Sequence, residues 1–533
     1  MKTNTQRCLR RCAVAAAVAL CLANHGQAAN IVVKSTAEGS VAGTCTLQDA
    51  IIAVNTQISD PNNSCGHGDG NSDTIYLTLL PVYPATITLT AGTVTINGAD
   101  FAIDVTQAVK IVGPTDANGQ PEVTLERSGA AGTANFGLVF ADANLTIDGL
   151  ALRNGNSIDG GAIRANTFVN VALSNSVVSG NAASVNGGGI YAVVGGITLS
   201  HVTISGNQAG NRGGGVYAVP GTVAIDNSTI SGNSALQGAG ICTNNGNISI
   251  TNSSVSGNSA SGKGGGVYTQ AGTVQIHYST ISGNSAAVNG GGIRSADGPV
   301  SLDHSTLSAN SANAAGGGIS LYAMSVQASY STFNGNSAAT HGGAIYAGQT
   351  AAASLTNSTI SGNTAGQSGG GIYANTAELN YATVYANQST ASGSKGAGVY
   401  VMTGATANAS IIAGSIGFDD LDAKNGAALS GNYNIIGSSG VSTPANDINC
   451  ASGIHLGPLA NFGGLTKTLP LLSGSCAIDA ASANPGVATD QRGLARPAGS
   501  GSIAQADVGA FEKQSAADPD FIFIDGFGPT GSD

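Results

Sequence analysis

The chain has 533 residues, of which 79 are glycine and only 9% are charged, and its formal net charge is −11. A thinly charged acidic surface has no basic patch for nucleic acid or anionic lipid, so both are excluded as partners. After residue 29 no segment reaches the roughly 18 consecutive apolar residues of a transmembrane helix.

Residues 1–29 have the three parts of a removable signal peptide. A basic region at 2–11 precedes an apolar run at 12–23 and a small-residue exit at 27–29. Cys21 raises the alternative of a lipoprotein, but Leu20 before it is too large for the usual lipobox. We therefore expect export and cleavage near Ala29. The segment holds four basic and no acidic residues, so its loss changes the net charge from −11 to −15.

Residues 30–135 are predicted to be an N-terminal capping module. Cys45 and Cys65 are predicted to form a disulfide in an oxidising compartment. The segment 45–51, which reads Cys-Thr-Leu-Gln-Asp-Ala-Ile, resembles the module named for its Cys-Ser-Leu-Arg-Glu-Ala motif in bacterial surface proteins. Asn55 and the segment 73–75 extend the resemblance.

The segment from Asp69 to Asp73 has the alternating oxygen ligands of a calcium loop. However, Thr74 stands where that loop has glycine, and Leu80 stands where it has a bidentate glutamate. A Gly- and Asp-rich loop without a cofactor is therefore the favoured interpretation, and calcium is the alternative.

Residues 136–415 contain one unit repeated ten times at intervals of 24 to 27 residues. The marker is an asparagine, at Asn156, Asn181, Asn207, Asn233, Asn258, Asn284, Asn310, Asn336, Asn363 and Asn387. Each is followed by a glycine-rich stretch and an aliphatic residue, at Ile163, Ile190, Val216, Ile241, Val267, Ile293, Ile319, Ile345, Ile372 and Val399. A fixed period of this length indicates a solenoid, a propeller or an array.

The pattern within one repeat selects among these folds. Val223, Ile225 and Ile230 alternate with less apolar residues at the two-residue period of a strand, and no repeat has the apolar spacing of a helix. Propeller blades need longer repeats of roughly 40 to 45 residues. The sequence therefore predicts a right-handed parallel β-helix, an all-β solenoid whose ten coils make a rod about 45 to 50 Å long. The segments Phe333–Asn336 and Gly342–Ile345 are similar to the repeats of polymorphic outer-membrane proteins.

The residue after each aliphatic is predicted to point outward and to form a column. Six of its ten members are tyrosine, at Tyr191, Tyr217, Tyr268, Tyr346, Tyr373 and Tyr400; the others are Arg164, Cys242, Arg294 and Ser320. Exposed aromatic faces with phenol hydroxyls suit sugar rings or a partner protein. The alternative, which repetition alone favours, is that stacked tyrosines stabilise neighbouring strands. Cys242 has no predicted partner, so we expect its thiol to react in the native protein.

His277 and Asp303 are the weak catalytic candidates. They fall in one outward column on adjacent coils, so they are expected about 5 Å apart. No second carboxylate or basic group accompanies them in the sequence. His201 and His304 belong to another column of mainly Asn and Tyr, whose expected role is to satisfy turn backbone groups, and they lie too far apart to share a metal. No metal site is predicted.

Residues 416–515 are predicted to be a C-terminal module that caps the end of the rod, followed by a tail at 516–533. Cys450 and Cys476 are its predicted disulfide, since metal ligation would need clustered Cys or His. Its short motifs, in chain order, resemble those of the choice-of-anchor Q domain: Gly463–Thr466, Ala477–Ala480, Asp490–Gly493, Ala495–Pro497 and Asp507–Glu512. The resemblance implies a secreted or surface-displayed β-helix protein and transfers no catalytic residue.

Together these features favour a binding or adhesion rod, extracellular or on the outer surface of a bacterium, with a glycan or another cell-surface molecule as its partner. One alternative is a polysaccharide lyase or glycoside hydrolase, which rests on fold analogy alone. Another is a passive structural surface protein. Because residues 150–400 are poor in paired carboxylates and basic groups, a binding protein is favoured over an enzyme.

Overall fold

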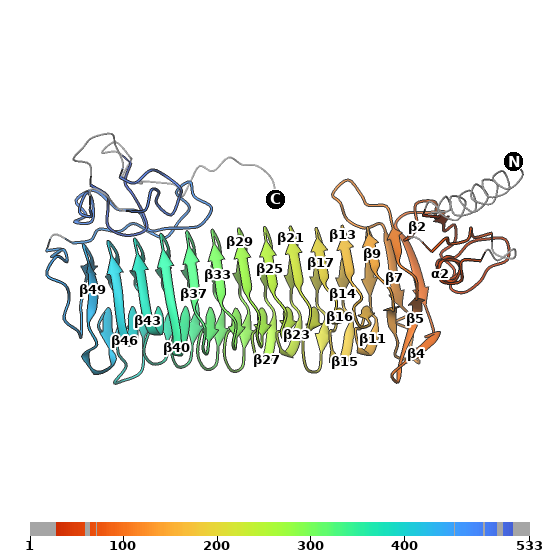
Figure 1. Ribbon diagram of the computed structural model, residues 1–533, viewed down its shortest axis with the longest axis horizontal. Helices are drawn as coiled ribbons and strands as arrows, with labels where there is room; N and C mark the ends of the chain where they lie inside the picture. Colours follow the sequence, from red (N-terminus) through yellow and green to blue (C-terminus); the bar gives the residue numbers. More distant parts are fainter. Residues whose placement is uncertain are drawn as a thin grey trace, which may run out of the picture.

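A computed structural model describes residues 28–58, 64–70, 72–451, 453–482, 486–497 and 505–514. The predicted signal peptide, apart from Ala28 and Ala29, and the predicted tail at 516–533 lie outside these residues. Three sheets of 26, 14 and 10 strands, almost all paired in parallel, form the sides of a rod (Figure 1). The chain is a right-handed parallel β-helix of about 12 turns, as the repeat predicted.

Each central coil consists of four short strands separated by tight corners. One complete coil contains β20 (Val216–Val219), β21 (Val223–Asp226), β22 (Thr229–Ser231) and β23 (Ser234–Gln237). Each strand pairs in parallel and in register with its equivalent on the next coil, β20 with β24 (Ile241–Thr243) and β21 with β25 (Ile248–Thr251). In three later coils the first two strands join into the longer β40 (Ile345–Thr356), β43 (Ile372–Asn380) and β46 (Val399–Asn408).

The solenoid extends beyond the predicted repeat region of 136–415 in both directions. On the N-terminal side β1 (Asn30–Val32), β2 (Asp73–Tyr76) and β6 (Val109–Val112) are parallel members of the large sheet. On the C-terminal side β49 (Leu429–Asn432) and β50 (Ile435–Ile436) continue the stack. Much of the predicted N-terminal module is therefore solenoid in its own right, which explains about 12 turns where ten were expected.

The predicted aliphatic residues fill the rod. All ten that follow the glycine-rich stretches are fully buried, and Val223, Ile225 and Ile230 are at most 2% exposed. They belong to one continuous apolar core shared by every coil. Burying such a side chain contributes about 1.5 to 3 kcal/mol, and a single coil cannot achieve it without neighbours above and below.

Nine of the ten repeated asparagines form a buried ladder along this core. They are Asn181, Asn207, Asn233, Asn258, Asn284, Asn310, Asn336, Asn363 and Asn387, each at most 1% exposed. After Asn181, each Oδ1 of the asparagine ladder accepts from the backbone N–H and from Nδ2 of the asparagine one coil earlier, as Asn284 does from Asn258 at 3.0 and 2.9 Å. The ladder thus satisfies backbone donors at a corner where no strand pairing does so.

Asn156 is not part of the asparagine ladder. Its register partner is Ala182, and the backbone N–H of Gly155 takes the ladder position by donating to Asn181 Oδ1 (2.9 Å). Asn156 is partly exposed and donates to Asn135 Oδ1 (2.9 Å). The expectation of ten equivalent asparagines is therefore wrong at this position, because the first coil is shifted by one residue.

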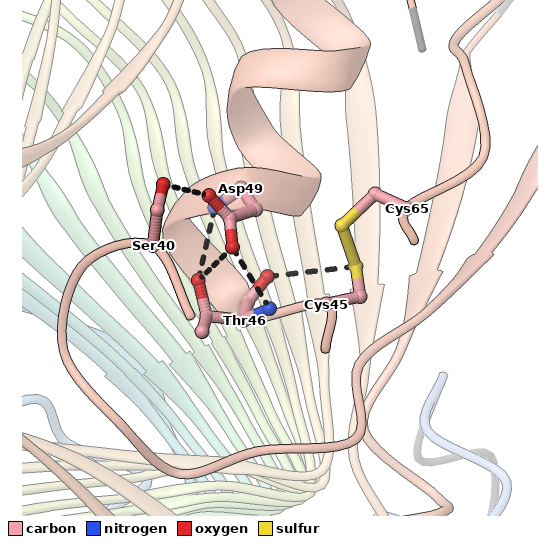
Figure 2. The surroundings of a disulfide bond; sticks show 5 residues. All are labelled: Ser40, Cys45, Thr46, Asp49 and Cys65. Carbon is pink, nitrogen blue, oxygen red and sulfur yellow. Dashed lines mark hydrogen bonds between the residues drawn. A yellow bond between two sulfur atoms is a disulfide. The ribbon is translucent and has the colours of Figure 1, made fainter. Parts of the chain in front are cut away.

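An amphipathic helix covers the N-terminal end of the rod. In α2 (Leu47–Thr56), Leu47, Ala50, Ile51 and Val54 are buried in the same core as the coils. Thr46 caps the helix, since its hydroxyl accepts from the Asp49 N–H (3.2 Å) while the Asp49 carboxylate accepts from the Thr46 N–H (3.3 Å). Figure 2 shows this capping box beside the Cys45–Cys65 disulfide, which confirms that predicted pair.

The C-terminal module lies along the side of the rod (Figure 1). Leu471, Val508 and Phe511 pack on Tyr381 and Ile411 of the solenoid and form a second apolar cluster. Buried Gln491 accepts from Thr359 Oγ1 (2.6 Å) and donates to Thr332 Oγ1 (3.0 Å). The predicted Cys450–Cys476 disulfide is confirmed. This disulfide cross-links a module that lies on the side of the rod, whereas the sequence predicted a cap at the end of the rod.

Candidate functional site

The ten predicted column residues do align on successive coils, but the middle five, from Tyr217 to Ser320, are buried. Tyr217 pairs in register with Tyr191 and with Cys242, which pairs with Tyr268. Tyr217 is 3% exposed, Cys242 0% and Tyr268 6%, so the expectation of an exposed stripe is wrong for this part. Together these three residues form a small apolar cluster, which fits the packing interpretation.

This part of the column is buried because the backbone turns sharply at the glycine-rich stretch just before each strand and lies against the column residues. Gly213, with φ of +64°, lies so close to the next strand that a Cβ on it would be 2.5 Å from Tyr217 Cβ. The side chain of its neighbour Arg212 also contacts Tyr217, since Nη1 donates to the Tyr217 hydroxyl oxygen (3.0 Å). The glycine-rich stretch therefore turns an outward-pointing position into a buried one.

Three tyrosines at the C-terminal end of the column form a partly exposed ridge. The tyrosine ridge consists of Tyr346 on β40, Tyr373 on β43 and Tyr400 on β46, with ring centroids 5.2 Å apart in both pairs. The ring centroid of His341 lies 4.6 Å from that of Tyr373. Burial lowers the pKa of His341, which favours its uncharged imidazole beside the ridge.

Cys242 differs from its sequence-based expectation. The thiol has no disulfide partner and is fully buried, and burial raises its pKa. A buried thiol with a raised pKa is neither accessible nor present as the reactive thiolate. The expectation that it reacts in the native protein is therefore wrong.

We expect Cys242 to resist alkylation in the folded protein and to react only after denaturation. Iodoacetamide labelling with and without guanidinium, followed by peptide mass spectrometry, measures this directly. The half-cystines Cys45, Cys65, Cys450 and Cys476 serve as internal controls, since they should stay unmodified in both conditions until a reductant is added. Rapid native labelling at Cys242 would contradict the burial.

His277 and Asp303 meet as the sequence predicted. They pair in register on β29 (Val274–His277) and β33 (Val300–Asp303), and His277 Nδ1 lies 3.9 Å from Asp303 Oδ2. His304, which sequence analysis placed in a separate column, is closer, with Nδ1 3.0 Å from the same oxygen. Ser329 Oγ also donates to Asp303 (2.8 Å). The turn after Asp303, where His304 has φ of +44°, folds the second imidazole back, and strand alternation gives no signal of this.

The surroundings keep Asp303 ionised. Burial raises its pKa, but hydrogen bonds from His304 and Ser329 and the nearby imidazoles lower it more, so the net pKa is below its usual value. The open hollow around it, about 450 Å³ in volume, contributes no second carboxylate among the residues described. A general acid with a raised pKa and a partnering carboxylate, as glycoside hydrolysis needs, is therefore not assembled from those residues.

Metal ligation is not supported by the residues the structure describes. Among them, no group of three or more His, Cys, Asp or Glu is arranged to hold a metal ion. In the loop considered for calcium, the Asp73 carboxylate accepts from the backbone N–H groups of Ala29 (2.9 Å) and Asp69 (3.2 Å). Asn71 of that loop lies outside the described residues, so calcium binding there stays a prediction.

No described helix is long and apolar enough to cross a membrane.

The predicted column of Asn, His and Tyr residues lies in the turn that follows a strand, as His304 follows Asp303. Its members have left-handed backbone, as Asn252 does with φ of +47°. Stacking within it is strongest where His304 lies between Tyr278 and Tyr330, with centroids 5.2 and 4.6 Å away. Further along, Asn357 Nδ2 donates to the carbonyl of Thr489 in the C-terminal module (2.7 Å).

Comparisons with known proteins agree with this architecture. A family model described as a right handed beta helix region matches residues 194–360, and the Chlamydia polymorphic membrane protein repeat matches residues 357–375. A crystal structure of pectate lyase Pel9A is similar at 12% identity over 91% of this chain and 97% of that chain, with a TM-score of 0.33. A likeness this weak carries no functional argument.

A search of curated proteins gave no match. Residues 357–375 are thus similar to one repeat of the polymorphic membrane proteins, the family that the motifs at 333–345 also resemble. The two disulfides are typical of proteins from oxidising compartments. The chain is an all-β right-handed parallel β-helix, and one of its segments is similar to the Chlamydia polymorphic membrane protein repeat.

Proposed function

We propose that this protein is an exported, surface-displayed rod whose tyrosine ridge binds a glycan or another cell-surface molecule. The observation that carries the proposal is the stack of Tyr346, Tyr373 and Tyr400, three partly exposed rings at regular 5.2 Å spacing. Aromatic faces edged by phenol hydroxyls combine apolar contact with hydrogen bonding, which suits sugar rings and protein partners alike.

The surroundings of the ridge support a binding role. Its three tyrosines belong to β40, β43 and β46, the longest strands of the solenoid, which hold the rings on a rigid platform. A ridge on such a platform keeps its spacing before a ligand arrives, so little ordering entropy is lost on binding. The predicted signal peptide and two disulfides of the kind that persist in oxidising surroundings support display outside the cell.

The enzymatic alternative rests on His277, Asp303 and His304. The two imidazoles lie 3.9 and 3.0 Å from one ionised carboxylate, and the described hollow offers no second carboxylate for hydrolysis. A passive structural role is the third interpretation, in which the ridge only stabilises neighbouring strands. A reducing-sugar assay on pectin and alginate, run beside a glycan array, separates the three, because the binding rod should bind without releasing sugar.

Replacing Tyr346 and Tyr373 together by alanine should abolish binding to the glycan array or to cell surfaces. The cost in stability should be only about 0.5 to 2 kcal/mol, as expected for cross-strand pairs at a surface. Binding per folded molecule, measured beside thermal melting, tests the two effects separately.

The matched control is Tyr217→Ala, in the buried part of the same column. This variant should lose more stability, because it opens a cavity beside Cys242, yet bind as well as the parent protein when folded. The adhesion proposal fails if the Tyr346 and Tyr373 variant melts much earlier while its binding per folded molecule is unchanged.

A further inference from the structure

A cleft lies between the solenoid and the C-terminal module, at the far end of the long strands from the tyrosine ridge. Its volume is about 320 Å³. Its floor comes from four successive coils, where Thr356 on β40, Asn380 on β43, Asn408 on β46 and Asn432 on β49 are register partners. We call it the amide cleft, and we propose that it binds an uncharged carbohydrate.

The wall opposite the floor belongs to the module. Ser482, Gly486 and Val487 line it, and Tyr433 of the solenoid, 41% exposed, stands beside the asparagines. The cleft therefore exists only because the module docks on the side of the rod. A volume of this size is at the lower end of small-molecule sites, which suits one sugar ring.

The floor presents amides at the regular inter-strand spacing of about 4.8 Å. Asn408 Nδ2 donates to Asn380 Oδ1 (2.9 Å), and Asn446 Nδ2 donates to Asn432 Oδ1 (3.3 Å). An amide offers two donors and two acceptor sites, so these bonds between described residues orient the side chains and use only part of their capacity. Oriented donors and acceptors beside an exposed aromatic ring match the hydroxyls and the apolar face of a sugar.

Charge decides which class of sugar fits. The described residues that line the amide cleft include no Lys, Arg, His, Asp or Glu. A neighbouring hollow of about 450 Å³ lies over the same strands two residues earlier, at Ser354, Glu378, Thr406 and Ser430, and Glu378 is its only charged lining residue. An acidic sugar would need Arg or Lys partners and would be repelled by a chain of net charge −11. The geometry thus points to a neutral oligosaccharide, with one ring in the cleft and the next over the neighbouring hollow.

The test is a calorimetric titration of the whole protein with short neutral oligosaccharides of glucose, mannose, xylose or galactose, and with galacturonic acid oligosaccharides. At least one neutral series should bind, and the acidic series should not. The double variant Asn380→Ala and Asn408→Ala should weaken the binding about tenfold or more, the loss expected from removing two hydrogen-bonding side chains. Val487→Trp should block it by filling the cleft from the module side, and it tests the proposal even if the double variant folds poorly.

Two further variants locate the effect. Thr251→Ala, in the same outward column as Asn380 but on a distant coil, should bind like the parent protein. The Tyr346 and Tyr373 variant should also retain the titrated binding, since the tyrosine ridge is a separate surface. Binding of the acidic series alone, no binding of any neutral series, or unchanged binding in Val487→Trp would overturn the proposal. Loss of binding in the ridge variant alone would overturn it too, while leaving the proposed function intact.

Discussion

Replacing Asn284 by alanine should lower the free energy of unfolding by about 3 to 6 kcal/mol, since each buried polar group left unsatisfied costs about 1 to 3 kcal/mol. The Asn284 amide is fully buried in the middle of the asparagine ladder. Its Oδ1 accepts twice from Asn258, and its Nδ2 donates to the carbonyl of Val255 (2.9 Å) and to Asn310 Oδ1 (3.0 Å). Alanine removes all four bonds and leaves their partners in the core, out of reach of water.

Because stability in a solenoid is a sum over neighbouring coils, the damage should be local at first. Hydrogen exchange of the coils around residues 255–310, together with thermal melting, would show it. Asn156→Ala is the matched control: the sequence makes the two asparagines equivalent, but Asn156 is partly exposed and outside the ladder. The Asn156→Ala variant should lose well under half as much free energy of unfolding as Asn284→Ala. Equal losses in the two variants would contradict the one-residue shift of the first coil.

Replacing Arg496 by alanine should release or unfold the C-terminal module. The side chains of Arg496 and Glu512 are 0% and 1% exposed, and Nη1 lies 3.2 Å from Glu512 Oε2. Removing one partner of a buried ion pair costs about 3 to 5 kcal/mol, because the other charge stays buried. Arg496 also donates to the carbonyls of Asp507 (2.7 Å) and Gly509 (2.9 Å), and its guanidinium lies 4.3 Å from the Tyr381 ring of the solenoid.

Asp507 is a second buried acidic group close to Arg496 and Glu512. Burial and then repulsion from Glu512 raise the pKa of Asp507 to about 7, while the Arg496 charge lowers it, so the variant would lose the positive charge that faces both carboxyl groups. Limited proteolysis should cut the Arg496→Ala protein within residues 453–514 while the solenoid survives, and calorimetry should show the module melting earlier. Arg153→Ala, at an exposed arginine of the solenoid, is the control. A module that stays protected in Arg496→Ala would show that apolar packing alone holds it.

Helix α2 is announced in the sequence by a local signal that the repeat period does not contain. Thr46 followed three residues later by Asp49, just before a run of apolar residues, is the pattern of a capped helix start. The C-terminal motifs are a different case, because Gln491 and Arg496 act on solenoid residues more than 100 positions away, at Thr359 and Tyr381.

The sequence alone determined the solenoid, its inward aliphatics, both disulfides and the meeting of His277 with Asp303. All of these follow from a fixed period or from local pairing, and a period places equivalent residues one above another whatever the details of the corners. The tertiary structure decided three features that the repeat period does not determine. The glycine corner buried Tyr217 and Cys242, the shifted first coil removed Asn156 from the ladder, and the lateral docking of the module created the amide cleft. Each depends on how closely two backbone segments approach in space, and repeat spacing carries no information about that distance.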